Sequence, residues 1–360
     1  MPFPDQLDDL SQVLTSEERV EPAMPARFVT AAVDHRVIGA CVLALEDERL
    51  ALPDEEARRL RDAYAVAALS TGLARRELPA VAAAVERSTS APAIVLKGPA
   101  ISDRLYPDPA LRPFGDLDLL IDRAALEQAK RALRGVGYEE QVEYRRGFAI
   151  VHGHTIDMRR ALGRRSVHVE LHWRVSDDRL GEAISHASLL PRAEAIPEIP
   201  GAALPSLPDQ LLVCAVHLMS HREKRLAWLE DIRRLHRAME AEAWNEAFRR
   251  AQGLGLLWVL NRALDYVERY LALTLPRPLA AGQPPPFGPI RAIEELDLQA
   301  SANIGRLAAL PWRRRPALVR DILVPSRDGL EGLVGGDGAG RLRQVARHAG
   351  LIARGITLRG

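Results

Sequence analysis

The sequence predicts an α/β (α+β) protein in which a small mixed-sheet domain lies between N- and C-terminal helical units. Apolar residues recur at helical spacing over residues 25–88 and again over 206–273. Between these stretches, short apolar runs with a period of two are separated by proline and glycine clusters, as expected for strands joined by turns and helices. A length of 360 residues is sufficient for two or three packed units, and 47% hydrophobic with 27% charged residues excludes a largely disordered or collagen-like chain.

Net charge and cysteine content exclude further classes of protein. The 49 basic and 48 acidic residues give a formal charge of +1, which argues against a surface devoted to nucleic acid or to an anionic membrane. Two cysteines, Cys41 and Cys214, are too few for a disulfide framework. The acidic start lacks the features of an export signal, and the apolar stretch from Val37 to Leu45 is too short to span a membrane. We therefore expect a cytoplasmic protein.

The first predicted unit is helical and spans residues 1–88. Its apolar residues follow helical spacing with no strand-like alternation. Residues 1–60 contain 13 acidic and 6 basic residues, whereas residues 301–360 contain 11 arginines and 4 acidic residues. The two ends of the chain therefore carry opposite charges. The breaker cluster Ser88-Thr-Ser-Ala-Pro marks the end of the unit.

A strand, a turn and a helix are predicted next. The run Ala93-Ile-Val-Leu is short and apolar, and it ends at Lys97-Gly98-Pro99. Because the first helical turn does not need the amide hydrogen that proline lacks, Pro99 can open a helix that continues to Leu105.

The centre of the predicted sheet contains a pair of acidic residues. In Gly115-Asp-Leu-Asp-Leu-Leu-Ile the period of two places Asp116 and Asp118 on one face of a strand. Asp122 can cap a helix over residues 123–134. Two more strands are predicted at 148–158 and 167–175, and they complete a sheet domain over residues 89–205.

Helical spacing returns after the proline-rich stretch 191–208. Ser206-Leu-Pro-Asp209 has the spacing of a capping box, and the helical unit that it opens is expected to span residues 206–275. Residues 276–360 are predicted to be a proline-rich linker and a basic tail.

The acidic pair predicts a metal site. Two carboxylates at positions i and i+2 raise each other's pKa unless a cation lies between them, and Mg²⁺ prefers such oxygen ligands together with substrate phosphates. The turn at Lys97-Gly98 lies just upstream, where lysine supplies a compact charge for a phosphate group. Arg112 is either a second phosphate ligand or a residue that holds its own loop together.

These motifs resemble a known superfamily. The segments are Leu-Lys-Gly, Tyr-Pro, Arg112, Gly-Asp-Leu-Asp-Leu-Leu and Val-Glu-Leu-His-Trp-Arg. Together they are similar to the DNA polymerase β-like nucleotidyltransferases, and specifically to an uncharacterised bacterial family found among peptide natural-product and other gene clusters. The resemblance extends from about His35 to Leu273, and it leaves residues 276–360 outside.

The resemblance implies roles for individual residues. Gly98 is the turn glycine beside the triphosphate, Asp116 and Asp118 hold two magnesium ions, and Glu170 is the third metal-binding acid. Asp157 also lies on a predicted strand and stays open as an alternative to Glu170. Pro99 departs from the family pattern because it removes an amide donor after the glycine, so phosphate binding is expected to depend partly on Lys97.

The implied reaction is the magnesium-dependent transfer of a nucleoside monophosphate from an NTP, with ATP the expected donor. The acceptor is expected to be a small molecule or a peptide, and a role in natural-product biosynthesis follows from the resemblance. A nucleic-acid acceptor is disfavoured because the one short basic run, Arg313 to Arg315, has no aromatic platform for bases. The basic tail could instead bind a partner protein. The alternative is a non-catalytic member of the same fold that binds nucleotide or a partner.

Several histidines accompany these acids. His168, Glu170 and His172 share one predicted strand face, where the histidines either orient Glu170 or contact the acceptor, or simply form internal hydrogen bonds. His217 and His221 lie four residues apart, but no third ligand is evident, so we expect them to line the substrate cleft or to pack between units rather than to bind zinc.

Overall fold

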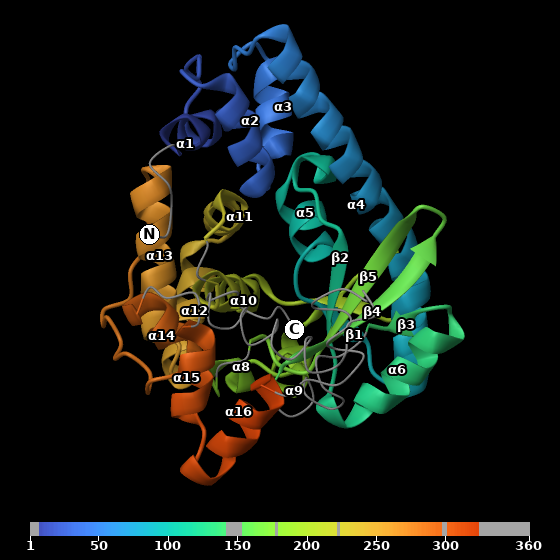
Figure 1. Cartoon of the computed structure of the whole chain (residues 1–360). Helices are drawn as coiled ribbons and strands as arrows, with labels where there is room; N and C mark the ends of the chain where they lie inside the picture. Colours follow the sequence, from blue (N-terminus) through green and yellow to red (C-terminus); the bar gives the residue numbers. More distant parts are fainter. Residues whose placement is uncertain (1–6, 142–152, 177–178, 222–223, 297–300, 324–360) are drawn as a thin grey trace.

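The computed structural model describes residues 7–141, 153–176, 179–221, 224–296 and 301–323 (Figure 1). The strands are β1 Ala93–Val95, β2 Asp116–Leu120, β3 Glu139–Glu140, β4 Thr155–Leu162, β5 Arg165–His172, β6 Glu194–Ala195 and β7 Ala202–Leu204. The α-helices are α1 Asp8–Thr15, α2 Pro25–Asp34, α3 Ile38–Glu46, α4 Asp54–Thr89, α5 Pro99–Leu105, α6 Leu126–Gly135, α8 Arg179–Ala183, α9 His186–Leu189, α10 Leu207–Met219, α11 Leu226–Ala238, α12 Ala241–Gly253, α13 Leu257–Leu271, α14 Pro289–Leu296, α15 Ser301–Ala309 and α16 Arg315–Leu323. Short 3₁₀ helices span Pro109–Leu111, Arg123–Ala125, Leu190–Arg192 and Trp312–Arg314.

The strands form one mixed sheet in the order β3-β4-β5-β2-β1-β7-β6. The central strand β2 is parallel to β5 and antiparallel to β1, and β1 is parallel to β7. This arrangement confirms the predicted α/β class with a mixed sheet and flanking helices.

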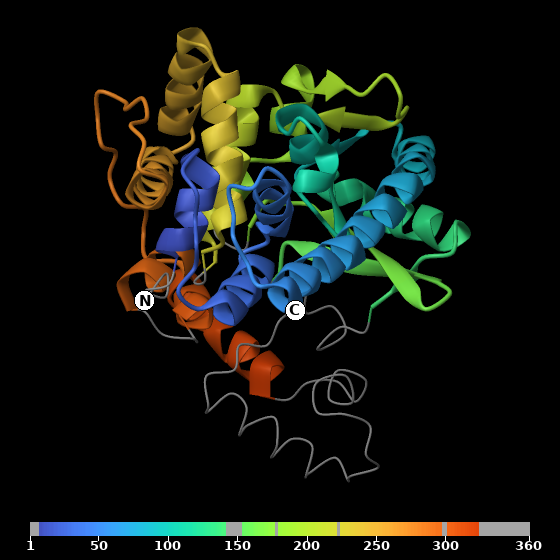
Figure 2. The ribbon, with the colours of Figure 1, turned by 90° about the horizontal axis from the view of Figure 1, so that it is seen from above.

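Helices cover the two faces of the sheet. Along β2, Leu117 and Leu119 pack in one core with residues of α4 and α6, and α4 runs along this face (Figure 2). Leu120 points to the other face, where it shares a second core with Leu211 of α10. Because side chains alternate along a strand, Asp116 and Asp118 point to the same face as Leu120. The acidic pair therefore faces the C-terminal helical unit.

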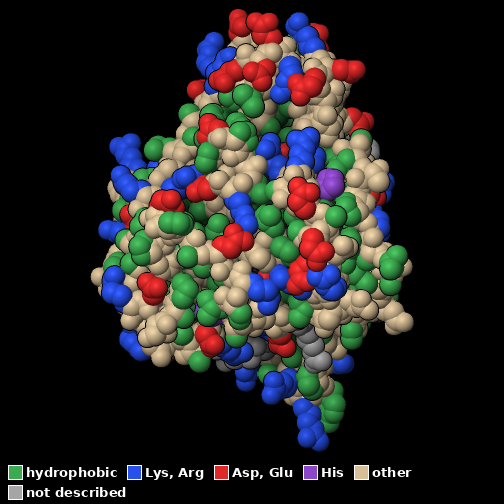
Figure 3. All heavy atoms as spheres, turned by 180° about the vertical axis from the view of Figure 1, so that it is seen from behind, with side chains coloured by type: hydrophobic (Ala, Val, Ile, Leu, Met, Phe, Trp, Pro, Cys, Tyr) green, Lys and Arg blue, Asp and Glu red, His purple; other side chains and the backbone are tan. Residues whose placement is uncertain are grey.

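The N- and C-terminal helical units share a single core. Leu10 of α1, Phe28 of α2 and Leu264 of α13 belong to one buried cluster, and α1 packs directly against α13. Acidic side chains gather at the end of the molecule formed by the α3–α4 region, and a group of Lys and Arg side chains lies below them (Figure 3).

The structure corrects three details of the predicted elements. The strand expected at 148–158 is β4, which begins at Thr155 and continues to Leu162, and part of the expected range lies outside the described residues. Ser206 does not form a capping box, because its hydroxyl donates to the carboxylate of Asp209 (2.9 Å) instead of accepting an amide hydrogen. The expected linker-like tail contains α14, α15 and α16 within its described part, and Ile290 of α14 is fully buried.

No helix in the described ranges combines the length and the apolar character needed to cross a membrane.

Candidate active site

The parallel pairing of β2 with β5 brings the acidic residues together. Asp118 lies opposite Glu170 in this register, and Asp116 lies opposite His168. Paired residues in neighbouring strands point to the same face of a sheet. The period of two in both segments therefore places four polar side chains side by side on the face toward the C-terminal helices.

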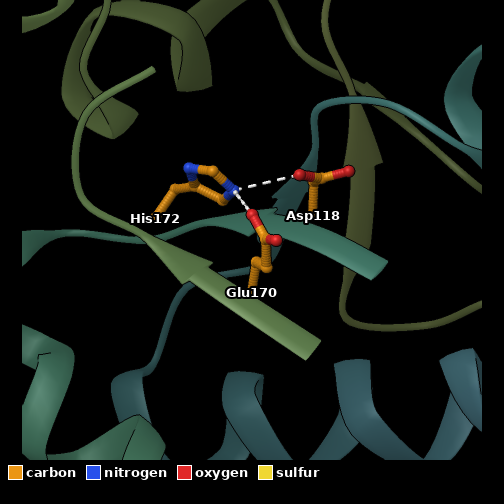
Figure 4. A group of neighbouring side chains, drawn as sticks. All are labelled: Asp118, Glu170 and His172. Carbon is orange, nitrogen blue, oxygen red and sulfur yellow. Dashed lines mark hydrogen bonds and ion pairs between the residues drawn. The ribbon is translucent and has the colours of Figure 1, made fainter. Parts of the chain in front are cut away.

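His172 lies between two carboxylates. Its Nε2 atom is 3.0 Å from Asp118 Oδ1 and 3.1 Å from Glu170 Oε2 (Figure 4). Lys97 Nζ, from the turn after β1, lies 2.7 Å from the same Asp118 oxygen. The side chains of Asp118 and His172 are almost completely buried, whereas that of Glu170 is 33% exposed. The cluster therefore opens to solvent on the Glu170 side.

Charges within the cluster stabilise one another. Burial alone would raise the pKa of Asp118, but Lys97 and His172 hold it well below its ordinary range. Burial would lower the pKa of His172, but its hydrogen bonds to Asp118 and Glu170 raise it to about 9. At neutral pH the buried cluster therefore contains two carboxylates and two side-chain cations.

Asp116 has a different electrostatic environment. Burial raises its pKa, and the neighbouring Asp118 raises it further, whereas Lys97 and Arg36 act in the opposite direction. The negative charge of Asp116 is therefore less well compensated than that of Asp118. A cation bound beside Asp116 would relieve this repulsion.

Gly98 shapes the turn that presents Lys97. Its backbone φ of +60° lies in the region that favours glycine, and a Cβ atom there would lie 3.2 Å from the Phe114 ring. Pro99 then begins α5, which ends at Leu105 as its sequence predicts. On the other side of the turn, the buried Gln210 of α10 donates a hydrogen bond to the carbonyl oxygen of Leu96 (2.8 Å). Sequence analysis did not identify Gln210, which is a lone amide in an apolar helix.

The alternative third acid, Asp157, has another partner. It lies opposite Glu170 on β4, but its carboxylate is 3.1 Å from Nδ1 of His168. Glu170, in contrast, shares His172 with Asp118. The structure thus brings Lys97, Asp118, Glu170 and His172 into direct contact, and it leaves Asp157 beside them in a separate pair.

Arg112 lies against α11. Its guanidinium binds both carboxylate oxygens of Asp231, with Nη2 2.8 Å from Oδ2 and Nε 2.9 Å from Oδ1. The hydroxyl group of Tyr106 donates to the same carboxylate (2.9 Å). The sequence leaves two roles open for Arg112: a phosphate ligand, or a residue that holds its own loop together. The buried pair with Asp231 matches the second role.

A group of histidines lies near the cluster. The His217 ring lies 4.7 Å from that of His221 and 4.6 Å from that of Trp228, and the His154 ring lies 5.4 Å from that of His172. Burial, with nearby cations such as Lys97, lowers the pKa of His217 and His221, so both are neutral at pH 7. His221 nevertheless remains accessible to solvent. His217 and His221 therefore pack against Trp228 of α11, and a role in lining a substrate cleft stays a prediction.

The donor atoms fit a divalent cation. One donor atom from each of Asp118, Glu170 and His172 lies within 4.8 Å of the others. Carboxylates suit Mg²⁺ and Mn²⁺, and an imidazole is also a ligand for transition metals. In addition, His172 Nδ1 is buried and finds no hydrogen-bond partner in the described part of the chain. A cation bound here would replace positive charge that Lys97 and His172 now supply.

Comparison with known proteins identifies one family. A family model described as an uncharacterised nucleotidyltransferase matches residues 21–272. No curated protein and no solved structure matches the chain significantly. The matched residues include the whole carboxylate and histidine cluster, whereas α14, α15 and α16 lie beyond them.

Proposed function

We propose a function on a single premise: the chain belongs to the uncharacterised nucleotidyltransferase family. The proposed reaction is the magnesium-dependent transfer of a nucleoside monophosphate from an NTP, with ATP as the expected donor, to a small molecule or a peptide. The observation that carries this proposal is the contact among Lys97, Asp118, Glu170 and His172 beside the Gly98 turn.

We assign the metal-binding role to Asp116, Asp118 and Glu170. Bound divalent ions would neutralise charge on the phosphates and polarise the reacting phosphoryl group. Lys97 supports this assignment because its side chain is 21% exposed and already contacts the acid that a metal would bind. When Asp118 has another counter-ion, the Lys97 ammonium is free to bind a phosphate oxygen.

In the proposed step, an acceptor oxygen attacks the α-phosphorus of the NTP. A new P–O bond forms as the bond to the β-phosphate breaks, and pyrophosphate leaves. The proton of a hydroxyl acceptor passes to solvent, which reaches the cluster on the Glu170 side. The protein contributes mainly position and charge, as is usual in phosphoryl transfer.

A non-catalytic nucleotide-binding or partner-binding role is the second candidate. One observation favours it: Lys97 and His172 already neutralise Asp118, so the folded chain does not need a metal to keep this carboxylate buried. Pro99 also removes a backbone amide from the phosphate-binding turn.

Thermal unfolding with each of the four NTPs, with and without magnesium, tests the proposal. A ligand at about 100 times its Kd stabilises the native state by about 2.7 kcal/mol, which raises the midpoint clearly. We expect a magnesium-dependent rise in the wild type that is lost in Asp118→Asn and Glu170→Gln. Pyrophosphate release then separates an enzyme from a non-catalytic binder.

Asp157→Asn is the matched control, because Asp157 lies on the same sheet face but pairs with His168. It should respond like the wild type. Loss of the response in Asp157→Asn with retention in Glu170→Gln would reverse the assignment of the third acid, and a wild-type response in Asp118→Asn would refute the metal site.

A further inference from the structure

A cavity lies between the N-terminal helices and α11. Its volume is about 190 Å³, and it is bounded by the end of α1, the α2–α3 turn and α11. Six arginines line it, but only two acidic residues do, Glu17 and Glu230. The arginines are Arg36, Arg49, Arg112, Arg233, Arg234 and Arg237.

Most of these arginines already have acidic partners. Glu230 accepts hydrogen bonds from Arg233 (2.6 Å) and Arg234 (2.6 Å), and Arg112 binds Asp231. Arg36 and Arg237, in contrast, form no ion pair with any residue that the structure describes, and both are exposed. The cavity lining therefore has an excess of positive charge, supplied by the α2–α3 turn and by α11.

A hydrogen bond joins the α2–α3 turn to the start of α11. Arg36 lies in the α2–α3 turn, where its φ of +55° is unusual for a residue other than glycine. The amide group of Ala227 at the start of α11 donates to the carbonyl oxygen of His35 (3.2 Å), so the two walls are joined next to Arg36. Burial and the neighbouring Arg233 lower the pKa of Arg237, whereas Glu230 acts in the opposite direction.

The cavity also adjoins the candidate active site. Tyr106, Leu111 and Arg112, from the segment that leads from α5 into β2, line the cavity. Arg112 follows the 3₁₀ helix Pro109–Leu111 and lies four residues before Asp116, the first residue of β2. A group held in the cavity would therefore lie against the segment that leads to Asp116 and Asp118.

We propose that this cavity binds a compact dianion and that, if the proposed function holds, the dianion is the charged group of the acceptor. A phosphate monoester carries about two negative charges at neutral pH, and a small dicarboxylate carries the same charge. The guanidinium fork matches either group in a bidentate manner. Val37, Leu43 and Leu111 supply an apolar surface for the attached carbon atoms.

Calorimetric titration of the full chain with O-phosphoserine and with succinate tests the proposal and separates the two sources of the dianion. We expect at least one probe to bind the wild type, and Arg36→Gln and Arg237→Gln to bind it about tenfold or more weakly, a loss of about 1.4 kcal/mol. Arg131→Gln, an exposed arginine of α6 with no ion pair among the described residues, is the matched control and should bind like the wild type. Absence of binding of both probes, or unchanged binding in both cavity variants, would overturn the proposal.

The acceptor role needs a second measurement. With ATP and magnesium present, the probe that binds should change the rate of pyrophosphate release in the wild type but not in Arg36→Gln. If binding depends on these arginines but does not change this rate, the cavity binds the dianion, but the dianion is not the charged group of the acceptor. Asp118→Asn should still bind the probe, so a failure of the nucleotidyltransferase proposal would leave the binding result intact.

Discussion

The side chain of Asp118 is almost completely buried, and its Oδ1 atom has two cationic neighbours. Lys97 is 2.7 Å from this oxygen and His172 is 3.0 Å from it. A buried carboxylate without a counter-ion is costly, so the two cations keep the site folded when no substrate is present. A metal ion bound to Asp118 would displace these two cations, and a phosphate group would attract them.

This arrangement predicts a selective effect of Lys97→Met. The variant should lose magnesium-dependent NTP binding by about tenfold or more, since a charge-assisted contact contributes about 1.5–3 kcal/mol. It should also unfold more easily, because Asp118 would keep only His172 as a partner. Calorimetric titration with NTP and urea unfolding check the two effects.

Lys130→Met is the matched control, because Lys130 has a buried stem and binds Glu127 and Glu140 on the other side of the sheet domain. It should leave NTP binding unchanged. Equal NTP affinity in Lys97→Met and the wild type would show that Lys97 only neutralises Asp118.

The pair of Arg112 and Asp231 predicts a large effect on stability. Both side chains are nearly fully buried, so Arg112→Met should cost about 3–5 kcal/mol by leaving the Asp231 charge uncompensated. The double variant Arg112→Met/Asp231→Leu should recover much of this loss, because it removes both buried charges. Urea unfolding measures both values, and a single variant with wild-type stability would show that Arg112 does not hold the loop to α11.

Single residues at the site were predictable only in part. The period of two predicted the shared face of Asp116 and Asp118, because the direction of a strand side chain depends on local spacing. The Arg112–Asp231 pair joins positions 119 residues apart, and the contact of Gln210 with Leu96 joins positions 114 residues apart. No local pattern contains such contacts, since they depend on how distant elements pack.

Among the elements, α4 positions the loop that precedes β2. The Thr71 hydroxyl accepts a hydrogen bond from the amide group of Phe114 (2.9 Å) and lies 2.9 Å from the carbonyl oxygen of Phe114. Phe114 in turn packs closely on Gly98, where an added Cβ atom would lie 3.2 Å from its ring. The helix therefore holds the segment that connects α5 to the acidic strand β2.

Thr71→Val, which keeps the size of the side chain, tests this connection. Leaving the buried amide group of Phe114 without an acceptor should lower the free energy of unfolding by about 1–3 kcal/mol and reduce nucleotide binding. Thr30→Val is the control, because the exposed Thr30 hydroxyl bonds only within its own helix in the described structure. Equal losses of stability in the two variants, measured by urea unfolding, would contradict a special role for the α4 contact.

The success of element prediction varied with the strength of the local signal. Pro99 gave α5 its start, and the strand with Asp116 and Asp118 became β2. The Ser206 cap was wrong because the Asp209 carboxylate binds Arg192 and Arg250, and the Ser206 hydroxyl joins this network instead of capping the helix. The short tail helices had no clear pattern of apolar residues in the sequence. The buried face of α14, for example, depends on its packing against α10.

In the whole molecule, helices from the N-terminal and C-terminal units pack into one core beside the candidate site. The family and the mixed-sheet fold were predicted and are confirmed, because their motifs are local. The single core that joins α1 to α13 was not predicted, because helical periodicity identifies apolar faces but not their partners. The same reasoning applies to α14, which lies beyond the matched family region but docks on the helical unit.

Lys224 and Glu294 form a buried connection between α14 and the rest of the protein. Lys224 Nζ lies 3.4 Å from Glu294 Oε1 and 5.3 Å from the centre of the Tyr266 ring. Burial lowers the pKa of Lys224 from 10.5 to about 8, although Glu294 acts in the opposite direction. Between these two values the unfolded chain binds more protons than the folded chain, so this lysine makes the free energy of unfolding rise with pH.

Lys224→Met removes this dependence. Relative to the variant, the wild type should gain about 3 kcal/mol of stability as the pH rises from about 8 to 10.5, since each unit of pKa difference is equivalent to about 1.4 kcal/mol. Urea unfolding at several pH values, followed by tryptophan fluorescence, gives the difference directly. Glu294→Gln should move the rise to lower pH, because Glu294 holds the Lys224 pKa up. A constant difference between wild type and Lys224→Met across this range would mean that the ammonium group is not buried, and hence that α14 does not close over it in solution.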